Sequence, residues 1–256
     1  MVRRDSADPA RTLGLLWRTQ SRAGRSGLSI DAVVEAATQV ADAEGLAGVS
    51  MRRVAEQLKV GTMSIYTHVP AKDDLVQLMV DSALGELYDD MDVPSQAPGG
   101  WRGALMLIAR SNWDLYQRHP WLVDVSSARP VLGPRTTEKY EAELRPLDGL
   151  GLSDVEMDSV LTLVLTHVQA TATALVGVSR TRDESGLTDA EWWSATAPLL
   201  EKVVDGRRFP VASRVGTSAG ETFDAASDPA HAMAFGLECI LDGVAALIAR
   251  RASARS

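Results

Sequence analysis

A run of short side chains between Ser50 and Val69 has the residue types and spacing needed to contact a nucleic acid. A tight turn at residues 59–61 separates two short helical patterns within this run. The second pattern carries four small or flexible side chains on its outer side: Thr62, Met63, Ser64 and Thr67. The major groove of B-DNA admits one α-helix, and side chains of this size can approach the edges of the bases closely. We therefore predict that this segment enters a major groove.

Larger polar side chains near the same segment are suited to the DNA backbone. Tyr66, His68 and Lys72 can reach phosphates, and such contacts position a helix without reading the base sequence. Arg52, early in the preceding helix, can form a bidentate contact with guanine. Alternatively, these residues form the solvated polar face of three ordinary short helices, and spacing alone is compatible with both interpretations.

Helix signals around this run predict the elements that hold it. Ser29 begins an amphipathic pattern that Gly45 ends, and Ser50 is a second N-cap residue. A proline after Val69 ends the third helix, and a fourth helix starts near Ala71. The second and third predicted helices, Ser50–Leu58 and Thr62–His68, form a helix-turn-helix unit. Its apolar interior is predicted to consist of Val54, Ala55, Leu58, Val60, Ile65 and Val69.

The charge of the chain is unevenly divided. The net charge is −8, from 26 basic and 34 acidic residues. Residues 1–76 hold ten basic and nine acidic residues, a balance of +1, so the remainder carries sixteen against twenty-five, or −9. A phosphate backbone would therefore be met at the N-terminal end. The negative total argues against a second possible class, a nucleoid protein that binds DNA without sequence preference.

Residues 1–27 combine Arg, Ser and Gly with little periodicity, and we expect a flexible arm whose apolar cluster Leu13–Trp17 docks on the rest of the protein. Arg18, Arg22 and Arg25 could enter an adjacent minor groove, as basic arms of other helical DNA-binding proteins do. A tail that only aids solubility is an equally good interpretation.

The rest of the chain is predicted to be helical, which makes the fold all-α. We divide it into the arm (1–27), a helix-turn-helix DNA-binding domain (28–76) and a ligand-binding and dimerisation domain (77–256). In the last domain we expect a mobile loop over 207–229. The expected helices lie near 101–118, 134–149, 153–178, 188–204 and 230–250.

Two of these helices are apolar nearly all round, which predicts burial on most sides. They cover residues 160–178 and 232–248, and two copies of each would form a four-helix bundle in a homodimer. An internal core helix of a monomer is the alternative. The residues predicted to contact the second copy are Phe235, Gly236, Ile240, Gly243 and Leu247.

Tryptophan, methionine and histidine residues of the third domain could line an apolar cavity with a few polar anchors, which is the usual composition of a small-molecule site. Packing in the core is the alternative for each aromatic residue. The candidate ligand-binding residues are Met106, Trp113, His119, Trp121, His167 and Trp192.

Catalysis is a third possible class, and the sequence gives it little support. Four histidines and one cysteine, Cys239, are available, but none has the spacing of a metal site. There is no glycine-rich phosphate loop or nucleophile elbow. We predict no enzymatic activity, no cofactor and no metal. The single cysteine fits a reducing cytoplasm, and no apolar run approaches the roughly 20 residues of a membrane span, so a cytoplasmic protein is expected.

Three runs of residues together resemble the TetR family of one-component repressors. They are Gly45-Leu-Ala-Gly-Val-Ser-Met-Arg-Arg-Val-Ala55, Val60-Gly-Thr-Met-Ser-Ile-Tyr-Thr-His-Val69 and Lys72-Asp-Asp-Leu75, and they cover about 50 residues. A second resemblance, at Phe235-Gly-Leu-Glu238 and Ile240-Leu-Asp-Gly243, is to the last helix of the tetracycline-repressor type of C-terminal domain.

The resemblance implies a homodimer that binds double-stranded operator DNA, with a helical body that binds an effector. By position, it implies that Arg52, Thr62 and Met63 touch bases. It also implies that Ser64, Tyr66, His68 and Lys72 anchor phosphates or support the base contacts. Thr67 stands where the tetracycline repressor has tryptophan, and Met63 where it has proline, so the operator is expected to differ. We do not place the ligand set of that repressor on this sequence, so the resemblance does not extend to tetracycline as the effector.

Overall fold

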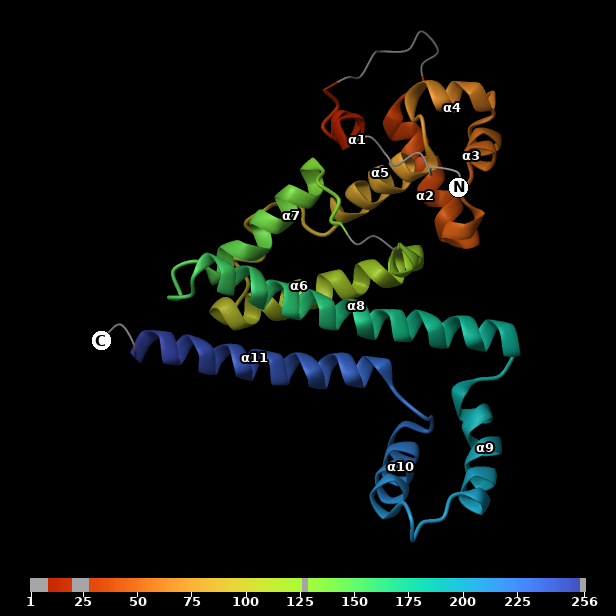
Figure 1. Ribbon diagram of the computed structural model, residues 1–256, viewed down its shortest axis with the longest axis vertical. Coiled ribbons are helices and arrows are strands. Elements are labelled where there is room, and N and C mark those ends of the chain that lie inside the picture. Colours follow the sequence, from red (N-terminus) through yellow and green to blue (C-terminus); the bar gives the residue numbers. More distant parts are fainter. Residues whose placement is uncertain (1–8, 20–27, 126–128, 254–256) are drawn as a thin grey trace, which may run out of the picture.

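The computed structural model describes residues 9–19, 28–125 and 129–253, and every regular element in these ranges is a helix (Figure 1). The predicted all-α fold is confirmed. A group of short helices lies at one end of the molecule, two long helices run side by side across its middle, and a pair of shorter helices projects at the other end (Figure 1). Helix α5 (Lys72–Leu84) leads from the short helices toward the long ones.

The group of short helices contains α2 (Ile30–Gly48), α3 (Met51–Leu58) and α4 (Thr62–His68). Ser29 and Ser50 cap α2 and α3, because their hydroxyls accept hydrogen bonds from backbone N–H groups of the first turns. Gly45 takes a positive φ of 74°, and α2 continues for one more turn beyond this kink. The interior is apolar as predicted, since Val54, Ile65 and Val69 are fully buried.

The expected flexible arm is partly wrong, because α1 (Pro9–Leu16) is a helix packed on α5. The fully buried Asp74 of α5 holds this helix in place. Its carboxylate accepts a 2.7 Å hydrogen bond from the Thr12 hydroxyl and forms an ion pair with Arg11 at 3.0 Å. The predicted docking of the Leu13–Trp17 cluster is confirmed by the indole N–H of Trp17, which donates to the carbonyl of Leu132 at 2.9 Å. Arg22 and Arg25 lie outside the described residues.

The helical body is built on α6 (Gly100–Arg118), α8 (Asp154–Ser185) and α11 (Pro229–Ser253), whose buried leucines, isoleucine and valines form one core. The 3₁₀ helix η1 (Pro120–Asp124), helix α7 (Pro134–Leu144) and η2 (Arg145–Leu147) cover its upper side. Glu156 joins the start of α8 to the end of α11, because its carboxylate accepts hydrogen bonds from Arg251 and from the Ser153 backbone. The Ser153 backbone N–H and the Arg251 guanidinium lower the pKa of Glu156 to about 2.

The expected mobile loop over 207–229 is wrong, because it contains α10 (Pro210–Phe223). Together with α9 (Asp189–Val203) this helix projects from the ends of α8 and α11 (Figure 1). Pro210 starts α10 at a position where a missing backbone N–H costs nothing. Trp193 of α9 meets Gly220 of α10 so closely that a Cβ at 220 would lie 2.6 Å from the indole. We call α9 and α10 the projecting hairpin.

Two helices, α8 and α11, are long and apolar enough to cross a membrane by length and composition alone. Both, however, contribute side chains to the core of the body. Such helices also occur in the cores of proteins with no membrane span, so their composition does not define one here.

Candidate nucleic-acid interface

Helix α4 presents the predicted base-reading side chains to solvent. Met63 is 76% exposed, and Thr67 is exposed, while Thr62 and Ser64 are half-buried. The buried Ile65 holds the opposite side of the helix against α3 and α2. Met63 therefore has most of its side chain in contact with solvent rather than with the protomer. This arrangement leaves one face of α4 available to a partner.

The turn before α4 is fixed by backbone geometry. Lys59 adopts the left-handed conformation at φ 56°, which ends α3 and lets its N–H and that of Val60 bond the last carbonyls. Gly61 precedes α4 without a side-chain cap. The two helices are therefore held in a helix-turn-helix arrangement by contacts that leave the outer face of α4 uncovered.

The predicted backbone-contacting residues also lie on or beside this face. Tyr66 is 43% exposed, His68 is half-buried at the end of α4, and Lys72 is exposed in the first turn of α5. The Arg52 side chain is 84% exposed and pairs with Glu56 at 2.9 Å. An exposed ion pair of this kind contributes about 0–1 kcal/mol, so Arg52 can exchange it for a contact to DNA.

His119 and Trp121, two of the predicted ligand-binding residues, lie between the short helices and the body. Each ring nitrogen of His119 forms a hydrogen bond, one with Asp42 of α2 at 2.8 Å and the other with Glu86 at 3.0 Å. The indole N–H of Trp121 donates to the same Asp42 carboxylate at 2.8 Å. Both side chains are buried, and Trp121 belongs to the core of the short helices. The polar needs of both are thus met within the protein.

The carboxylates around His119 were not predicted from sequence, because they come from positions 42 and 86, far from it along the chain. Burial of the imidazole by itself would lower its pKa, but the hydrogen bonds that its N–H groups donate to Asp42 and Glu86 outweigh that effect and raise the pKa. Arg118 also faces Glu86, at 4.0 Å. The charged imidazolium can donate to both carboxylates at once, which joins α2 to the segment after α5.

A pH dependence of stability follows from the raised pKa of His119. The contribution of His119 to the free energy of unfolding should be fully present below the pKa of histidine in the unfolded chain, near 6.5. It should be lost as pH rises through the higher pKa of His119 in the folded protein. Urea unfolding of the wild type and of His119→Gln across this window measures the contribution as the difference between them. The difference should shrink with rising pH; a constant or growing difference would mean that the bridging form is not the imidazolium.

The other four predicted ligand-binding residues are spread over the body. Met106 and Trp113 lie on α6, where Trp113 packs on the core and Met106 is 38% exposed. His167 of α8 contacts the carbonyl of Met233 at 3.0 Å. Trp192 is exposed on the projecting hairpin, next to Trp193. The structure therefore does not bring the six residues together in one cavity.

A buried polar network in the body was missed by the sequence analysis. Glu143 is fully buried and pairs with Lys139 at 2.5 Å, and it accepts hydrogen bonds from Asn112 at 2.8 Å and from Tyr88 at 2.9 Å. Burial and the Glu143 charge raise the pKa of Tyr88, so its phenol stays protonated. Lys139 and Glu143 are four residues apart, a spacing that indicates an ion pair on a helix but not its burial.

The five residues predicted to contact a second copy divide into two groups. Phe235 is 65% exposed on α11, and Gly243 has open space around its missing Cβ. Ile240 and Leu247 are partly buried against the core of the same protomer. A Cβ on Gly236 would lie 2.3 Å from the ring of His167, so within the protomer this glycine permits the close approach of α8 and α11.

The two glycines give a matched pair of substitutions. We expect Gly236→Ala to destabilise the protomer by about 1–3 kcal/mol, because the methyl group must displace the His167 ring. Gly243→Ala should be neutral or stabilising by up to about 1 kcal/mol, because alanine is the better helix former. Urea unfolding of both variants measures the contrast. Equal effects at the two positions would refute the packing role of Gly236.

Clusters of three or more His, Cys, Asp or Glu side chains able to hold a metal ion are absent from the described ranges. The structure places an exposed helix-turn-helix, formed by α3 and α4, at one end of a helical body. This combination defines a DNA-binding transcriptional regulator.

Comparison with known proteins identifies the family. Residues 33–79 match the model of the bacterial regulatory proteins of the tetR family, and residues 93–248 match that of the tetracyclin repressor-like C-terminal domain. The HTH-type transcriptional repressor DrrR1 of Streptomyces coeruleorubidus is 44% identical over 250 residues, covering 96% of this chain and 89% of that protein. The HTH-type transcriptional repressor Rv1353c of Mycobacterium tuberculosis is 27% identical, covering 92% and 87%.

Among solved structures, apo ActR from Streptomyces coelicolor superposes with a TM-score of 0.70 at 28% identity, covering 90% of this chain and all of that one. ActR has also been solved in complex with actinorhodin, with the same TM-score and identity, covering 86% and 97%. The chain belongs to the tetR family of bacterial regulatory proteins, and it is a transcriptional repressor.

Proposed function

We propose that this repressor acts as a homodimer, binds a near-palindromic operator through two copies of α4, and releases it when a small molecule binds the body. The observation that carries the proposal is the exposed face of α4, where Met63 is 76% exposed and Thr67 is also exposed. The acidic remainder of the chain is repelled by DNA, which favours binding through this end alone.

The operator geometry follows from two-fold symmetry. Two recognition helices that enter successive major grooves on one face of DNA must lie about 34–36 Å apart. We assign Arg52, Thr62, Met63 and Thr67 to base contacts, and Ser64, Tyr66, His68 and Lys72 to phosphate contacts or to support of the base contacts. In this assignment the DNA-binding domain covers residues 28–76.

The effector is proposed to bind the body, residues 77–256, near α6. Half-buried aromatic side chains, Trp113 among them, support an apolar site there, and the buried Glu143 network supplies polar anchors. ActR binds a small molecule, which supports effector binding in a similar body. Met106, Trp113 and His167 are the proposed contacts on the long helices. His119, Trp121 and Trp192 would respond through neighbouring segments.

Release is proposed to occur through α5, which packs against α2 and α7 and so joins both parts. An effector that prefers one body conformation changes the separation of the two α4 helices, and the shift is limited by its preference for that state. We further propose that the protein is cytoplasmic, without a membrane anchor, and has no catalytic activity.

The direct test is an electrophoretic mobility shift with the DNA upstream of the protein's own gene, in the presence and absence of candidate small molecules. The affinity should exceed that for unrelated DNA of the same length by about a thousandfold or more. Equal affinity for all DNA would refute operator reading. If none of the candidate small molecules weakens operator binding, the proposed release by an effector is wrong.

Substitution of Arg52 and Lys72 separates base reading from phosphate contact. Arg52→Ala should cost about 1–3 kcal/mol on the operator, and the loss should vanish when the contacted base pair is changed. Lys72→Ala should weaken all sequences alike and reduce the salt dependence of binding. Fluorescence anisotropy on a panel of operator variants measures both. A change of base preference in the Lys72 variant would contradict its assignment.

A further inference from the structure

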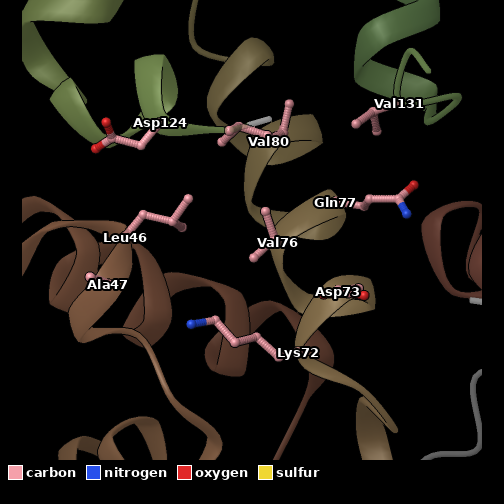
Figure 2. Close-up of a pocket in the computed structure, with 10 residues that line it drawn as sticks. Leu46, Ala47, Lys72, Asp73, Val76, Gln77, Val80, Asp124 and Val131 are labelled. Atoms are coloured by element: carbon pink, nitrogen blue, oxygen red, sulfur yellow. The ribbon is translucent and has the colours of Figure 1, made fainter. Parts of the chain in front are cut away.

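A crevice of about 770 Å³ lies between the short helices and the body (Figure 2). Its walls come from the end of α2 at Leu46 and Ala47, from one side of α5, and from Asp124, Val125 and Val131. This volume falls within the range of about 300–1,000 Å³ that small-molecule sites occupy. The crevice contains none of the six residues predicted to bind a ligand, so it is separate from the proposed effector site.

The walls of the crevice are mostly aliphatic. Val76 and Val80 of α5 face it together with Leu46 and Val125, and all four are half-buried. When an apolar ligand covers half-buried aliphatic side chains, binding is favoured by about 25 cal/mol for each Å² of apolar surface that is removed from water. The walls therefore favour a ligand with an apolar body.

The polar side chains of α5 line the crevice in two directions: Figure 2 shows Lys72 directed toward the end of α2 and the Gln77 amide directed toward the side of Val131. Lys72, Asp73 and Gln77 lie on the first two turns of α5. Asp124, by contrast, is engaged in a two-pronged ion pair with Arg180 at 2.9 and 2.5 Å. In the described parts of the chain, Lys72, Asp73 and Gln77 have no side-chain hydrogen bond or ion pair.

We propose that this crevice binds a small amphipathic anion, whose acidic group contacts Lys72 and whose apolar rings lie against Val76, Val80 and Val125. Asp73 accepts a hydrogen bond from a hydroxyl or N–H group of the same ligand, and Gln77 supplies a neutral amide. The site thus selects for an acid that also carries a donor, because a simple anion would be repelled by Asp73.

The crevice ligand and DNA compete for Lys72, a consequence that rests on the proposed phosphate contact of this residue. An ammonium group that is paired with a ligand acid is not available to a phosphate. Bound DNA should lower the affinity for the ligand by the same factor by which the ligand lowers that for DNA. The crevice is thus a second route by which a small molecule weakens operator binding, separate from the effector site proposed on α6 and α8.

The probe for the test is 8-anilinonaphthalene-1-sulfonate, which combines a sulfonate, an N–H donor and aromatic rings. Its fluorescence gives the affinity, and hydrogen exchange of the full-length protein locates it. We expect protection of residues 72–80 and 121–125. Lys72→Gln should weaken binding about fivefold or more, a loss of about 1 kcal/mol. Val76→Trp, which fills the crevice, should abolish binding.

Lys59→Gln is the matched control, because it removes an exposed lysine from the same domain outside the crevice. It should bind the probe as the wild type does. Circular dichroism establishes whether the Val76→Trp variant folds. If this variant does not fold, the probe affinity of Lys72→Gln tests the site by itself. Protection confined to α6 and α8, or undiminished binding by Lys72→Gln, would overturn the site.

Operator affinity, measured first without the probe, keeps the two proposals distinct. A protein that binds no operator fails the proposed function whatever the probe does. A protein that binds operator but shows no protection at α5 fails the crevice alone. Saturating probe should raise the apparent Kd for operator in the wild type and in Lys59→Gln, but not in Lys72→Gln. An unchanged Kd in the wild type would overturn the competition.

Discussion

Met63→Glu should lower operator affinity about 100-fold or more, because a loss of about 1.4 kcal/mol in each half-site counts twice in a dimer. Met63 is 76% exposed at the start of the recognition helix, so the substitution removes no packing from the protomer. A carboxylate at this position faces base edges that offer mainly acceptors, and it lies between two negatively charged backbones. Fluorescence anisotropy at fixed salt concentration measures the loss, and the thermal unfolding midpoint should not change.

Met63→Gln is the control for this prediction, since glutamine has the same length and polarity as glutamate but no charge. It should retain most of the affinity, and the difference between the two variants isolates the electrostatic cost. That difference should decrease as salt concentration rises. If both variants bind as tightly as the wild type, α4 does not enter the groove with this face.

The helix-turn-helix could be predicted because its signals are local. Ser50, Gly61 and the proline after Val69 mark helix boundaries through caps and backbone restrictions that act within a few residues. The apolar spacing then fixes which side of α4 is buried. The structure places Ile65 inside and Met63 outside, as that spacing indicates.

Helix α10 could not be predicted from composition. Gly, Ser, Thr and Ala are abundant in residues 207–229, and such composition is typical of loops. The structure shows that small residues are used for close approach instead, since Gly220 lies directly against Trp193. Composition alone does not distinguish a mobile loop from a helix that packs through its glycines.

The locations of the candidate ligand residues depended on contacts distant in sequence. His119 and Trp121 were assigned to the ligand site by residue type, yet both contact Asp42, which is 77 and 79 residues away. Which carboxylate meets which histidine depends on how α2 packs on η1. That packing is a property of the tertiary structure, and no spacing rule contains it.

Phe235→Asp should convert the proposed homodimer into a monomer. Phe235 is 65% exposed on α11, and within the protomer its ring stacks on that of His231, with the ring centroids 6.1 Å apart. Leu163 is also exposed, on α8, which packs along α11. A carboxylate is tolerated there in water, but its burial between two copies without a partner would cost several kcal/mol. Size-exclusion chromatography with light scattering measures the change in mass.

Leu132→Asp is the control, because Leu132 is similarly exposed, at 58%, but lies before α7 rather than on α8 or α11. It should leave the mass unchanged. Phe235→Asp should also steepen the operator-binding curve and shift it to higher concentration, since two monomers must now assemble on the DNA. A Phe235→Asp protein that keeps the wild-type mass would place the contact between copies on another surface. The exposed apolar side chains of the projecting hairpin, Leu199 and Val203 among them, would then be the next to substitute.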